Sequence, residues 1–514
     1  MTARSAGAPP IGRAAITNLG CKVNQAEMDS VERFLRARGV EIATGATAAD
    51  LHLVNTCTVT AAADDKSRKA VRRARRASPA ATVIVTGCAV QVAPASFAEM
   101  DPAARLVANE AKDGLLAEVE RLLGAPVPPG DGPHGDGQPG DRPPGDGPHD
   151  PLAAALPTLS GVEVEGMVDA RARIDRTRAY VKVQDGCSFF CTYCIIPRAR
   201  GPERSLPPEV VLADVRRALA AGHREVVLTG INIGTYDGGR SERGPRGSHL
   251  RAALTLPGLV RRILAETPVE RIRLSSIEPQ HVDDDLLAVW TGPGAGRCLP
   301  HLHLPLQSGD DRVLRRMGRR YAAADYARTV ERVRAAIPGV AVHADVIAGF
   351  PSEDDDAFAR TRDFLVALDP AGLHVFRYSA RPGTPAARMA GQVPDAVRKE
   401  RAALLLDDAA AARRRFAAHA AGARRTVLFE VPVDSPDSAA GWVGHAEDYV
   451  EVRAATSDGR SLAGEIGIVQ VDGTDPNDAE RAIGRIERIV AGPAAGPAAG
   501  RPAPRTLPVV PFPA

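Results

Sequence analysis

The stretch Cys187-Ser188-Phe189-Phe190-Cys191-Thr192-Tyr193-Cys194 places three cysteines within eight residues, with the spacing C-x3-C-x2-C. Three thiolates this close can bind one metal centre, but a structural zinc site and a ferredoxin-type cluster each take four protein ligands. The next metal-binding side chain, His223, lies too far along the chain to be an obvious fourth ligand. The spacing favours a [4Fe–4S] cluster whose fourth iron is open to a substrate. The alternative is a zinc loop completed from a distant segment.

The sequence around this triplet repeats a strand followed by a helix. We expect strands at 178–184, 225–230, 271–276, 301–304, 342–347 and 373–378, and amphipathic helices at 208–221, 257–266, 310–317, 324–337 and 354–368. Six parallel strands with crossover helices predict a partial (β/α)6 barrel. The triplet follows the first strand, and the chemistry of such barrels takes place at the carboxyl ends of the strands.

A second set of cysteines lies in the N-terminal part of the chain. Strands expected at 14–18, 51–55 and 82–86 alternate with helices expected at 25–38 and 64–77, which indicates an α/β domain with a parallel sheet. Cys21, Cys57 and Cys88 each follow one of these strands. Since the carboxyl ends of parallel strands face one crevice, we expect the three thiols to converge there on a second metal cluster. The alternative is three unrelated small buried residues.

The composition divides the rest of the chain. Residues 12–123 form the N-terminal domain, and residues 124–158, rich in Pro, Gly, Asp and His, are expected to be a disordered linker. The barrel domain is expected at 159–400. Short strands separated by Gly, Asp and Ser turns predict a small all-β domain at 423–490, and a disordered tail follows at 491–514.

The overall composition excludes several classes of protein. The net charge of +2 gives no global field for polyanions, so any nucleic-acid contact requires local arginine clusters. Seven cysteines in 514 residues argue against a secreted disulfide framework and favour metal or catalytic use in a reducing cytoplasm. We find no signal peptide and no membrane-spanning apolar run, so we expect a cytoplasmic protein without a membrane partner.

Taken together, these motifs resemble the radical S-adenosylmethionine (SAM) methylthiotransferases over nearly the whole chain outside linker and tails. Gly20-Cys21-Lys22-Val23-Asn24-Gln25 and Asp185-Gly186-Cys187, continuing through Cys191-Thr192-Tyr193-Cys194-Ile195-Ile196-Pro197, are most similar to the MtaB branch. The resemblance implies a radical SAM barrel and a C-terminal TRAM-like RNA-binding domain. It also implies 2-methylthiolation of N6-threonylcarbamoyladenosine at position 37, beside the anticodon of tRNA. Other branches act on isopentenyladenosine or on a ribosomal protein, and these alternatives stay open.

The resemblance also implies two [4Fe–4S] clusters and SAM as cofactors. Cys187, Cys191 and Cys194 would hold the cluster that binds and reductively cleaves SAM. Cys21, Cys57 and Cys88 would hold the auxiliary cluster that carries or donates the sulfur, and a second SAM would supply the methyl group. A radical is needed because carbon 2 of adenine is neither acidic nor usefully electrophilic.

SAM needs polar partners at the ends of the barrel strands, where several family-like segments lie. We expect Asn232, Ser276, Glu278 and Gln307 to be SAM neighbours, although polar residues in such loops are more generally turn formers. Cys298 belongs to neither triplet and is interpreted as structural.

The implied partners are a tRNA anticodon stem-loop and a flavodoxin- or ferredoxin-like electron donor, while the sulfur source is unknown. Trp442 and Tyr449 would stack on an unpaired base, and core packing is the alternative for Trp442. The family has a more basic segment after Pro197, where a substrate contact is implied, whereas residues 198–206 include Glu203. From another class, a non-catalytic zinc-containing RNA-binding protein remains the rival interpretation.

Overall fold

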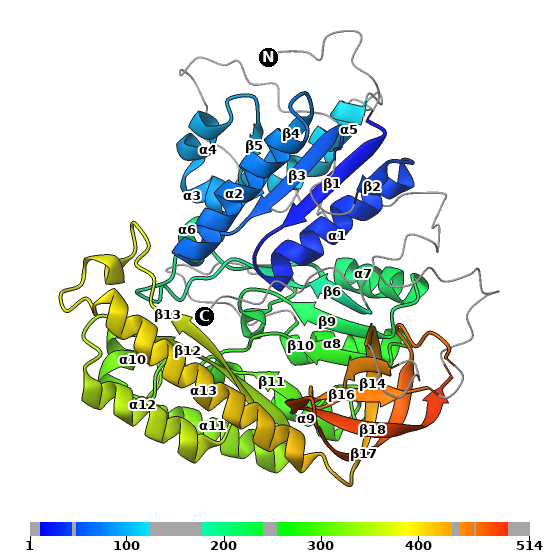
Figure 1. The fold of residues 1–514 in the computed structure, drawn as a ribbon, viewed down its shortest axis with the longest axis vertical. Coiled ribbons are helices and arrows are strands. Elements are labelled where there is room, and N and C mark those ends of the chain that lie inside the picture. The colour runs from blue at the N-terminus through cyan, green and yellow to red at the C-terminus, as the bar shows by residue number, and fades with distance from the viewer. Residues whose placement is uncertain are drawn as a thin grey trace, which may run out of the picture.

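The computed structural model describes residues 11–43, 48–123, 177–239, 254–433, 441–456 and 459–491. These residues form an N-terminal α/β unit at the top of Figure 1, a larger α/β unit below it, and a small β-barrel at the lower right. The predicted linker at 124–158 lies outside the described residues, as does the predicted tail from 492 onward. The predicted domain boundaries therefore remain predictions.

The N-terminal unit is a five-stranded parallel sheet with the order β2-β1-β3-β4-β5. The three predicted strands are confirmed as β1 (Arg13–Asn18), β3 (Leu51–Thr56) and β4 (Thr82–Gly87). The short edge strands β2 (Glu41–Ala43) and β5 (Arg105–Val107) were not predicted. The helices are α1 (Lys22–Ala37), α2 (Ala61–Ala77), α3 (Cys88–Val92), α4 (Pro94–Met100) and α5 (Leu115–Leu123). The central strand β3 is buried at every position, as expected for a strand covered on both faces.

The larger unit confirms the predicted partial (β/α)6 barrel. Its strands are β6 (Arg178–Lys182), β9 (Glu225–Thr229), β10 (Arg271–Leu274), β11 (His301–His303), β12 (Ala341–Ala348) and β13 (Gly372–Arg377). They pair in parallel as β6-β9-β10 and β11-β12-β13. Isolated parallel bridges from Ile272 to Cys298 and from Ser276 to His303 connect the two halves. One continuous curved sheet therefore carries the carboxyl ends of all six strands.

Helices cover the outside of this sheet, and all of them except α10 share one large apolar core with it, while α10 packs in a smaller neighbouring cluster. They are α7 (Pro208–Ala220), α8 (Leu256–Glu266), α9 (Asp284–Thr291), α10 (Asp311–Met317), α11 (Ala323–Ala336) and α12 (Asp355–Leu368). Aspartate side chains accept a hydrogen bond from a first-turn backbone N–H and so fix where α9, α10 and α12 begin, at Asp283, Asp310 and Asp354. The sequence analysis did not predict α9. No helix among the described residues is both long and apolar enough to span a membrane.

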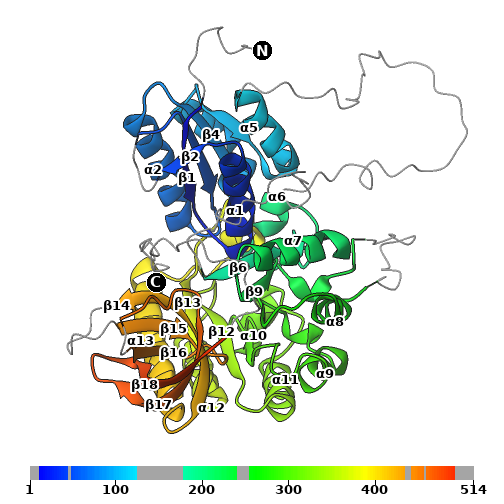
Figure 2. The same ribbon diagram turned by 90° about the vertical axis from the view of Figure 1, so that its right-hand side faces the viewer.

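The C-terminal part consists of a long helix and a closed barrel. Helix α13 (Asp395–His419), which the sequence analysis missed, leads into β14 (Arg424–Val433), β15 (Gly441–His445), β16 (Glu451–Ala455), β17 (Ile466–Asp475) and β18 (Asp478–Val490). These strands close in the order β14-β15-β16-β18-β17. Figure 2 shows this barrel beside β12 and α13, on the side away from α8 and α9. The predicted all-β architecture is confirmed, although β18 was not predicted.

A buried ionic network joins the N-terminal unit to the larger unit. Glu27 on α1 is almost fully buried and pairs with Lys112 (Oε2 to Nζ, 2.5 Å), Lys182 (Oε1 to Nζ, 3.0 Å) and Arg200 (Oε1 to Nη1, 3.2 Å). Burial alone would raise the pKa of Glu27, but these three cations outweigh it and hold the pKa well below its ordinary value. The carboxylate is therefore ionised, and it fixes how the two units meet.

We expect Glu27→Gln to lower the free energy of unfolding by about 3–5 kcal/mol, because it leaves buried cations without their carboxylate. The matched control is Glu41→Gln, since Glu41 pairs with Arg13 at the surface, where its side chain is 67% exposed. The control is expected to cost less than about 1 kcal/mol. Urea denaturation measures both variants, and equal losses would contradict the role assigned to Glu27.

Candidate active site at the junction of two domains

The C-x3-C-x2-C segment lies between the short strand β7 (Gln184–Asp185) and helix α6 (Ile196–Arg200). All three of its thiols are free and partly exposed. Burial, reinforced by the neighbouring cysteines, raises the pKa of Cys187 to about 11 and that of Cys194 to about 12. Three thiols close enough to affect one another, without a disulfide, form a donor set suited to a soft metal centre. That these three thiols hold one metal centre stays a prediction.

The N-terminal cysteines occupy corresponding places at the ends of three parallel strands. Cys21 precedes α1, Cys57 follows β3, and Cys88 begins α3 directly after β4. Burial is the main cause that raises the pKa of Cys57 to about 12, and the charges of Cys88 and Cys21 add to it. Cys21 is likewise affected by Cys88. The three thiols thus influence one another although they lie more than thirty residues apart in sequence, and their binding of one cluster stays a prediction.

Asn109 links the two cysteine sets. Its Nδ2 donates to the Sγ of Cys88 at 3.5 Å and to the carbonyl oxygen of Ala199 on α6 at 2.7 Å. Helix α3, which begins at Cys88, lies in contact with α6, which begins two residues after Cys194. The two sets therefore face the same junction between the N-terminal unit and the barrel.

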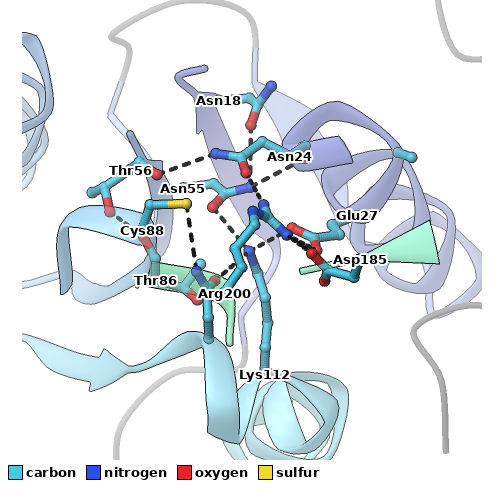
Figure 3. A network of polar contacts seen from close by, with 12 residues as sticks. Asn18, Asn24, Glu27, Asn55, Thr56, Thr86, Cys88, Lys112, Asp185 and Arg200 are labelled. Carbon is cyan, nitrogen blue, oxygen red and sulfur yellow. Dashed lines mark hydrogen bonds and ion pairs between the residues drawn. The ribbon is translucent and has the colours of Figure 1, made fainter. Parts of the chain in front are cut away.

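Arg200 lies at the centre of this junction. Its Nη1 donates to Asp185 Oδ1 at 2.8 Å, and its Nη2 donates to Asn24 Oδ1. Figure 3 shows Arg200 between Asp185, Glu27 and Asn24, with Cys88 on the other side. The guanidinium charge opposes the burial that raises the pKa of Cys21 and Cys57, so it favours the thiolate forms that a metal requires.

The four predicted SAM neighbours lie at the ends of three strands. Ser276 Oγ is 2.9 Å from His303 Nδ1, and Glu278 forms an ion pair with Arg319. Gln307 is buried with a positive φ of 74°, and Asn232 is buried with both side-chain amide atoms lacking a hydrogen-bond partner. No hydrogen bond among the described residues joins any two of the four. Buried polar atoms without partners are rare, so Asn232 is well placed to bind a polar ligand.

Arg319 was missed by the sequence analysis. It donates from Nη1 to the Sγ of Cys191 at 3.4 Å while its Nη2 pairs with Glu278, so it connects the cysteine triplet with the end of β10. Ordinary arginines are solvated, and no sequence pattern indicated that this arginine is buried. The sequence hinted at a special position for Arg319 only through Gly318, the residue before it, which ends α10 in a left-handed conformation.

The structure bears on the residues that were expected to contact RNA. Trp442 is buried in the apolar core of the C-terminal barrel, which confirms the core-packing alternative. Tyr449 stacks on His301 of the larger unit, with ring centroids 4.5 Å apart, instead of lying free on the surface. Arg200, in the segment after Pro197, is buried in ion pairs and is not available to a substrate phosphate.

Cys298 is buried in the barrel core, consistent with a structural role.

Comparison with known proteins agrees with this arrangement. Residues 13–109 match the family described as "Uncharacterized protein family UPF0004", and residues 181–365 match the "Radical SAM superfamily". The chain is 34% identical to the "Threonylcarbamoyladenosine tRNA methylthiotransferase MtaB" of Bacillus subtilis (strain 168), over 85% of this chain and 89% of that protein. The chain belongs to the radical SAM methylthiotransferase family. As a family member, this methylthiotransferase uses SAM and an iron–sulfur cluster.

Further relatives fall into two groups by name. The methylthiotransferase is 33% identical to the MtaB protein of Thermotoga maritima, over 81% of this chain and 86% of that protein. It is 31% identical to the "tRNA-2-methylthio-N(6)-dimethylallyladenosine synthase" of Maricaulis maris, over 88% of this chain and 97% of that protein. Among solved structures, the chain is similar to the cobalamin-containing radical SAM methyltransferase TsrM of Kitasatospora setae. The aligned region covers 73% of this chain and 77% of the TsrM chain, at 17% identity and a TM-score of 0.47.

Proposed function

We propose that the protein converts N6-threonylcarbamoyladenosine at position 37 of tRNA into its 2-methylthio derivative, using two four-iron clusters and SAM. In this proposal Cys187, Cys191 and Cys194 hold one cluster, and Cys21, Cys57 and Cys88 hold the other. The observation that carries it is the meeting of two three-thiol sets at one junction, connected through Asn109. Each set leaves one position of a four-ligand centre open, which suits one cluster that takes SAM and one that takes sulfur.

The cofactors supply the radical chemistry and the sulfur that carbon 2 of adenine requires and that side chains cannot provide. The chain's own residues position and shield them. Arg319 donates to the Cys191 sulfur and pairs with Glu278, so it fixes both side chains at the barrel end. Arg200 and Asn109 support the N-terminal thiols, since hydrogen bonds and positive charge stabilise thiolate ligands.

Asn232, Ser276, Glu278 and Gln307 are proposed to contact SAM. The amide of Asn232 offers an unpartnered donor and an unpartnered acceptor, which match the carboxylate and amino groups of an amino acid. Backbone N–H groups of Ile231 and Asn232 donate to Gln184 Oε1 at 2.9 and 3.0 Å, so this loop is fixed to the strand that precedes the cysteine triplet. A preorganised loop of this kind lowers the entropic cost of binding SAM.

The substrate is inferred from the relatives whose names specify threonylcarbamoyladenosine. The competing substrate is dimethylallyladenosine, which other relatives of similar identity are named for. Mass spectrometry of tRNA nucleosides from cells with and without the gene separates the two. We expect 2-methylthio-N6-threonylcarbamoyladenosine to disappear on deletion and its unthiolated precursor to accumulate; an unchanged level would contradict the proposal.

The C-terminal barrel is proposed to be a TRAM-like domain that contacts the anticodon stem-loop. Its exposed arginines, including Arg424 and Arg485, can contact phosphates, although both pair with carboxylates in the free protein. The reducing electron is proposed to come from a flavodoxin- or ferredoxin-like protein in the cytoplasm. A zinc-containing RNA-binding protein would instead retain zinc and would not cleave SAM on reduction.

The residue before Cys88 provides a test of the auxiliary site. Gly87 has a φ of 101°, and a Cβ there would lie 2.5 Å from Asn55 Oδ1 and from the Thr56 carbonyl oxygen. Gly39 also has a positive φ, of 76°, but nothing lies within 4 Å of its Cβ position. Both substitutions place an alanine at positive φ, at a cost of about 1–3 kcal/mol each, and Gly87, with a ψ of −170°, lies in a region that essentially only glycine adopts.

Only Gly87→Ala also forces a Cβ against Asn55 and the Thr56 backbone, so we expect only this variant to shift the following residue, Cys88. We expect it to retain about four irons per chain after anaerobic reconstitution, while Gly39→Ala retains about eight, as two four-iron clusters require. Iron and sulfide analysis measures both variants. Equal iron contents would mean that the backbone at Gly87 does not position a cluster ligand.

A further inference from the structure

A cluster of rings lies where the C-terminal barrel meets the inner face of the larger unit. Tyr449 stacks on His301 of β11 (centroids 4.5 Å apart) and contacts His343 of β12 edge-on (5.7 Å). The two histidine rings are 4.8 Å from each other. Tyr449 is held there in a left-handed conformation, with a φ of 72°, and its hydroxyl accepts a hydrogen bond from Arg178 Nη1 at 3.1 Å. We call His301, His343 and Tyr449 the ring cluster.

Positive charge exceeds negative charge around the ring cluster. Arg178, Arg271 and Arg273 share the carboxylates of Glu225 and Glu430, and the nearby Asp345 carboxylate pairs with His303 and His374. Lys22, the first residue of α1, forms no ion pair with any residue that the structure describes. Lys22 thus supplies a cation that no described carboxylate neutralises, which is the charge that an anionic ligand requires.

The Lys22 charge reaches the ring cluster. The Arg178 guanidinium is the main cause that lowers the pKa of Tyr449 to about 7, and His445, Lys22 and Arg273 add to it. Burial is the main cause that holds the pKa of His301 and of His343 well below its ordinary value, and Lys22 contributes to both. A position that favours a phenolate also favours a carboxylate, and two neutral imidazoles can donate hydrogen bonds to it.

The histidines have unused hydrogen-bonding capacity. His301 is 6% exposed, and neither its Nδ1 nor that of His343 has a hydrogen-bond partner, although both atoms are buried. A buried nitrogen without a hydrogen-bond partner destabilises a folded protein unless a ligand or a water molecule forms the missing hydrogen bond. The ring cluster is therefore polar and incompletely bonded, which does not suit an apolar prenyl group.

We propose that Lys22, His301 and His343 bind the carboxylate of the threonylcarbamoyl group and so select this substituent over the uncharged dimethylallyl group. This inference rests on the proposed function. Lys22 follows Cys21 directly, so a base whose carbon 2 faces the N-terminal cysteines has its N6 substituent within the same junction. Tyr449 closes the far side of the cluster, which makes the C-terminal barrel part of the substrate site.

The test compares two anticodon stem-loop RNAs. One carries N6-threonylcarbamoyladenosine, and the other carries the threoninol analogue, in which a hydroxymethyl group replaces the carboxylate. We expect the wild-type protein to prefer the carboxylate RNA by at least about 30-fold in kcat/KM, the loss typical of an unpaired buried charge. Lys22→Met is expected to bring the preference close to one, and Lys22→Arg to restore part of it.

Two further variants keep the test decisive. Lys399→Met, at an exposed position on α13, is the matched control and is expected to keep the wild-type preference. His343→Leu removes a proposed donor far in sequence from the cysteines, and it is expected to reduce the preference even if Lys22→Met loses a cluster. An unchanged preference in both Lys22→Met and His343→Leu would overturn the inference. Failure of the wild-type protein to thiolate either RNA would instead overturn the proposed function.

Discussion

Replacement of Cys187 by alanine is expected to abolish the reductive cleavage of SAM. Cys187 is one of three ligands in a set that has no described substitute thiol nearby, so its loss leaves two ligands for a centre that needs three from the protein. Loss of even a supporting residue around a metal costs 10–100-fold, so we expect a decrease of more than about 100-fold. The amount of 5′-deoxyadenosine formed with dithionite measures it.

Cys298→Ala is the matched control for this prediction. Cys298 is also a free cysteine of the larger unit, but it is buried in the apolar core and belongs to neither set. We expect this variant to cleave SAM at close to the wild-type rate. If Cys187→Ala also cleaved SAM normally, the C-x3-C-x2-C segment would not be the SAM site.

Replacement of Cys57 by alanine is expected to separate the two activities. Cys57 follows β3, is 6% exposed and belongs to the N-terminal set, so its removal disrupts the proposed sulfur-carrying cluster and leaves the barrel cysteines in place. The variant should still form 5′-deoxyadenosine but should make less than about 1% of the methylthio nucleoside. Liquid chromatography with mass spectrometry quantifies both products in one reaction.

The result that would count against the Cys57 prediction is thiolation at the wild-type level, which would remove the N-terminal cluster from the reaction. Loss of both products would also count against it, since it would mean that the two sets are not separable. Thr58→Ala is a suitable neighbouring control. Thr58 Oγ1 accepts a hydrogen bond from Arg381 across the domain junction, but it offers no thiol.

The positions of the six cysteines could be predicted because they follow from strand geometry. Each N-terminal cysteine stands next to the carboxyl end of a strand, and parallel strands bring those ends together whatever the sequence separation. The barrel strands were predictable for the same reason, since buried parallel strands are short apolar runs between amphipathic helices. The position of a cysteine just after a strand and the apolar run of a buried strand can both be recognised from a short segment of sequence.

The contacts between units could not be predicted, because they depend on which polar residues become buried when the units meet. Nothing in the sequence distinguishes Glu27, Arg200 or Arg319 from the solvated charged residues that surround them. Burial changes their role, because a charge removed from water needs a partner, and Glu27 and Arg200 find each other across 173 residues. The packing of Tyr449 was not predicted for the same reason, since its ring stacks on a histidine of another unit.

The missed elements have a related explanation. Strand β18 alternates charged and apolar residues because one face lies toward solvent, so it lacks the continuous apolar run of a buried strand. Helix α13 is rich in alanine and arginine, and it buries four alanines, Leu405 and the charged Arg401, so its apolar periodicity is weak.

The most direct test is iron and acid-labile sulfide analysis of the anaerobically reconstituted protein and of two triple variants, one replacing Cys21, Cys57 and Cys88 with alanine and the other replacing Cys187, Cys191 and Cys194. We expect about eight irons per chain in the wild-type protein and about four in each variant, since each set would hold one four-iron cluster. Zinc in place of iron, or a triple variant with the wild-type iron content, would contradict the assignment of two clusters to these six cysteines.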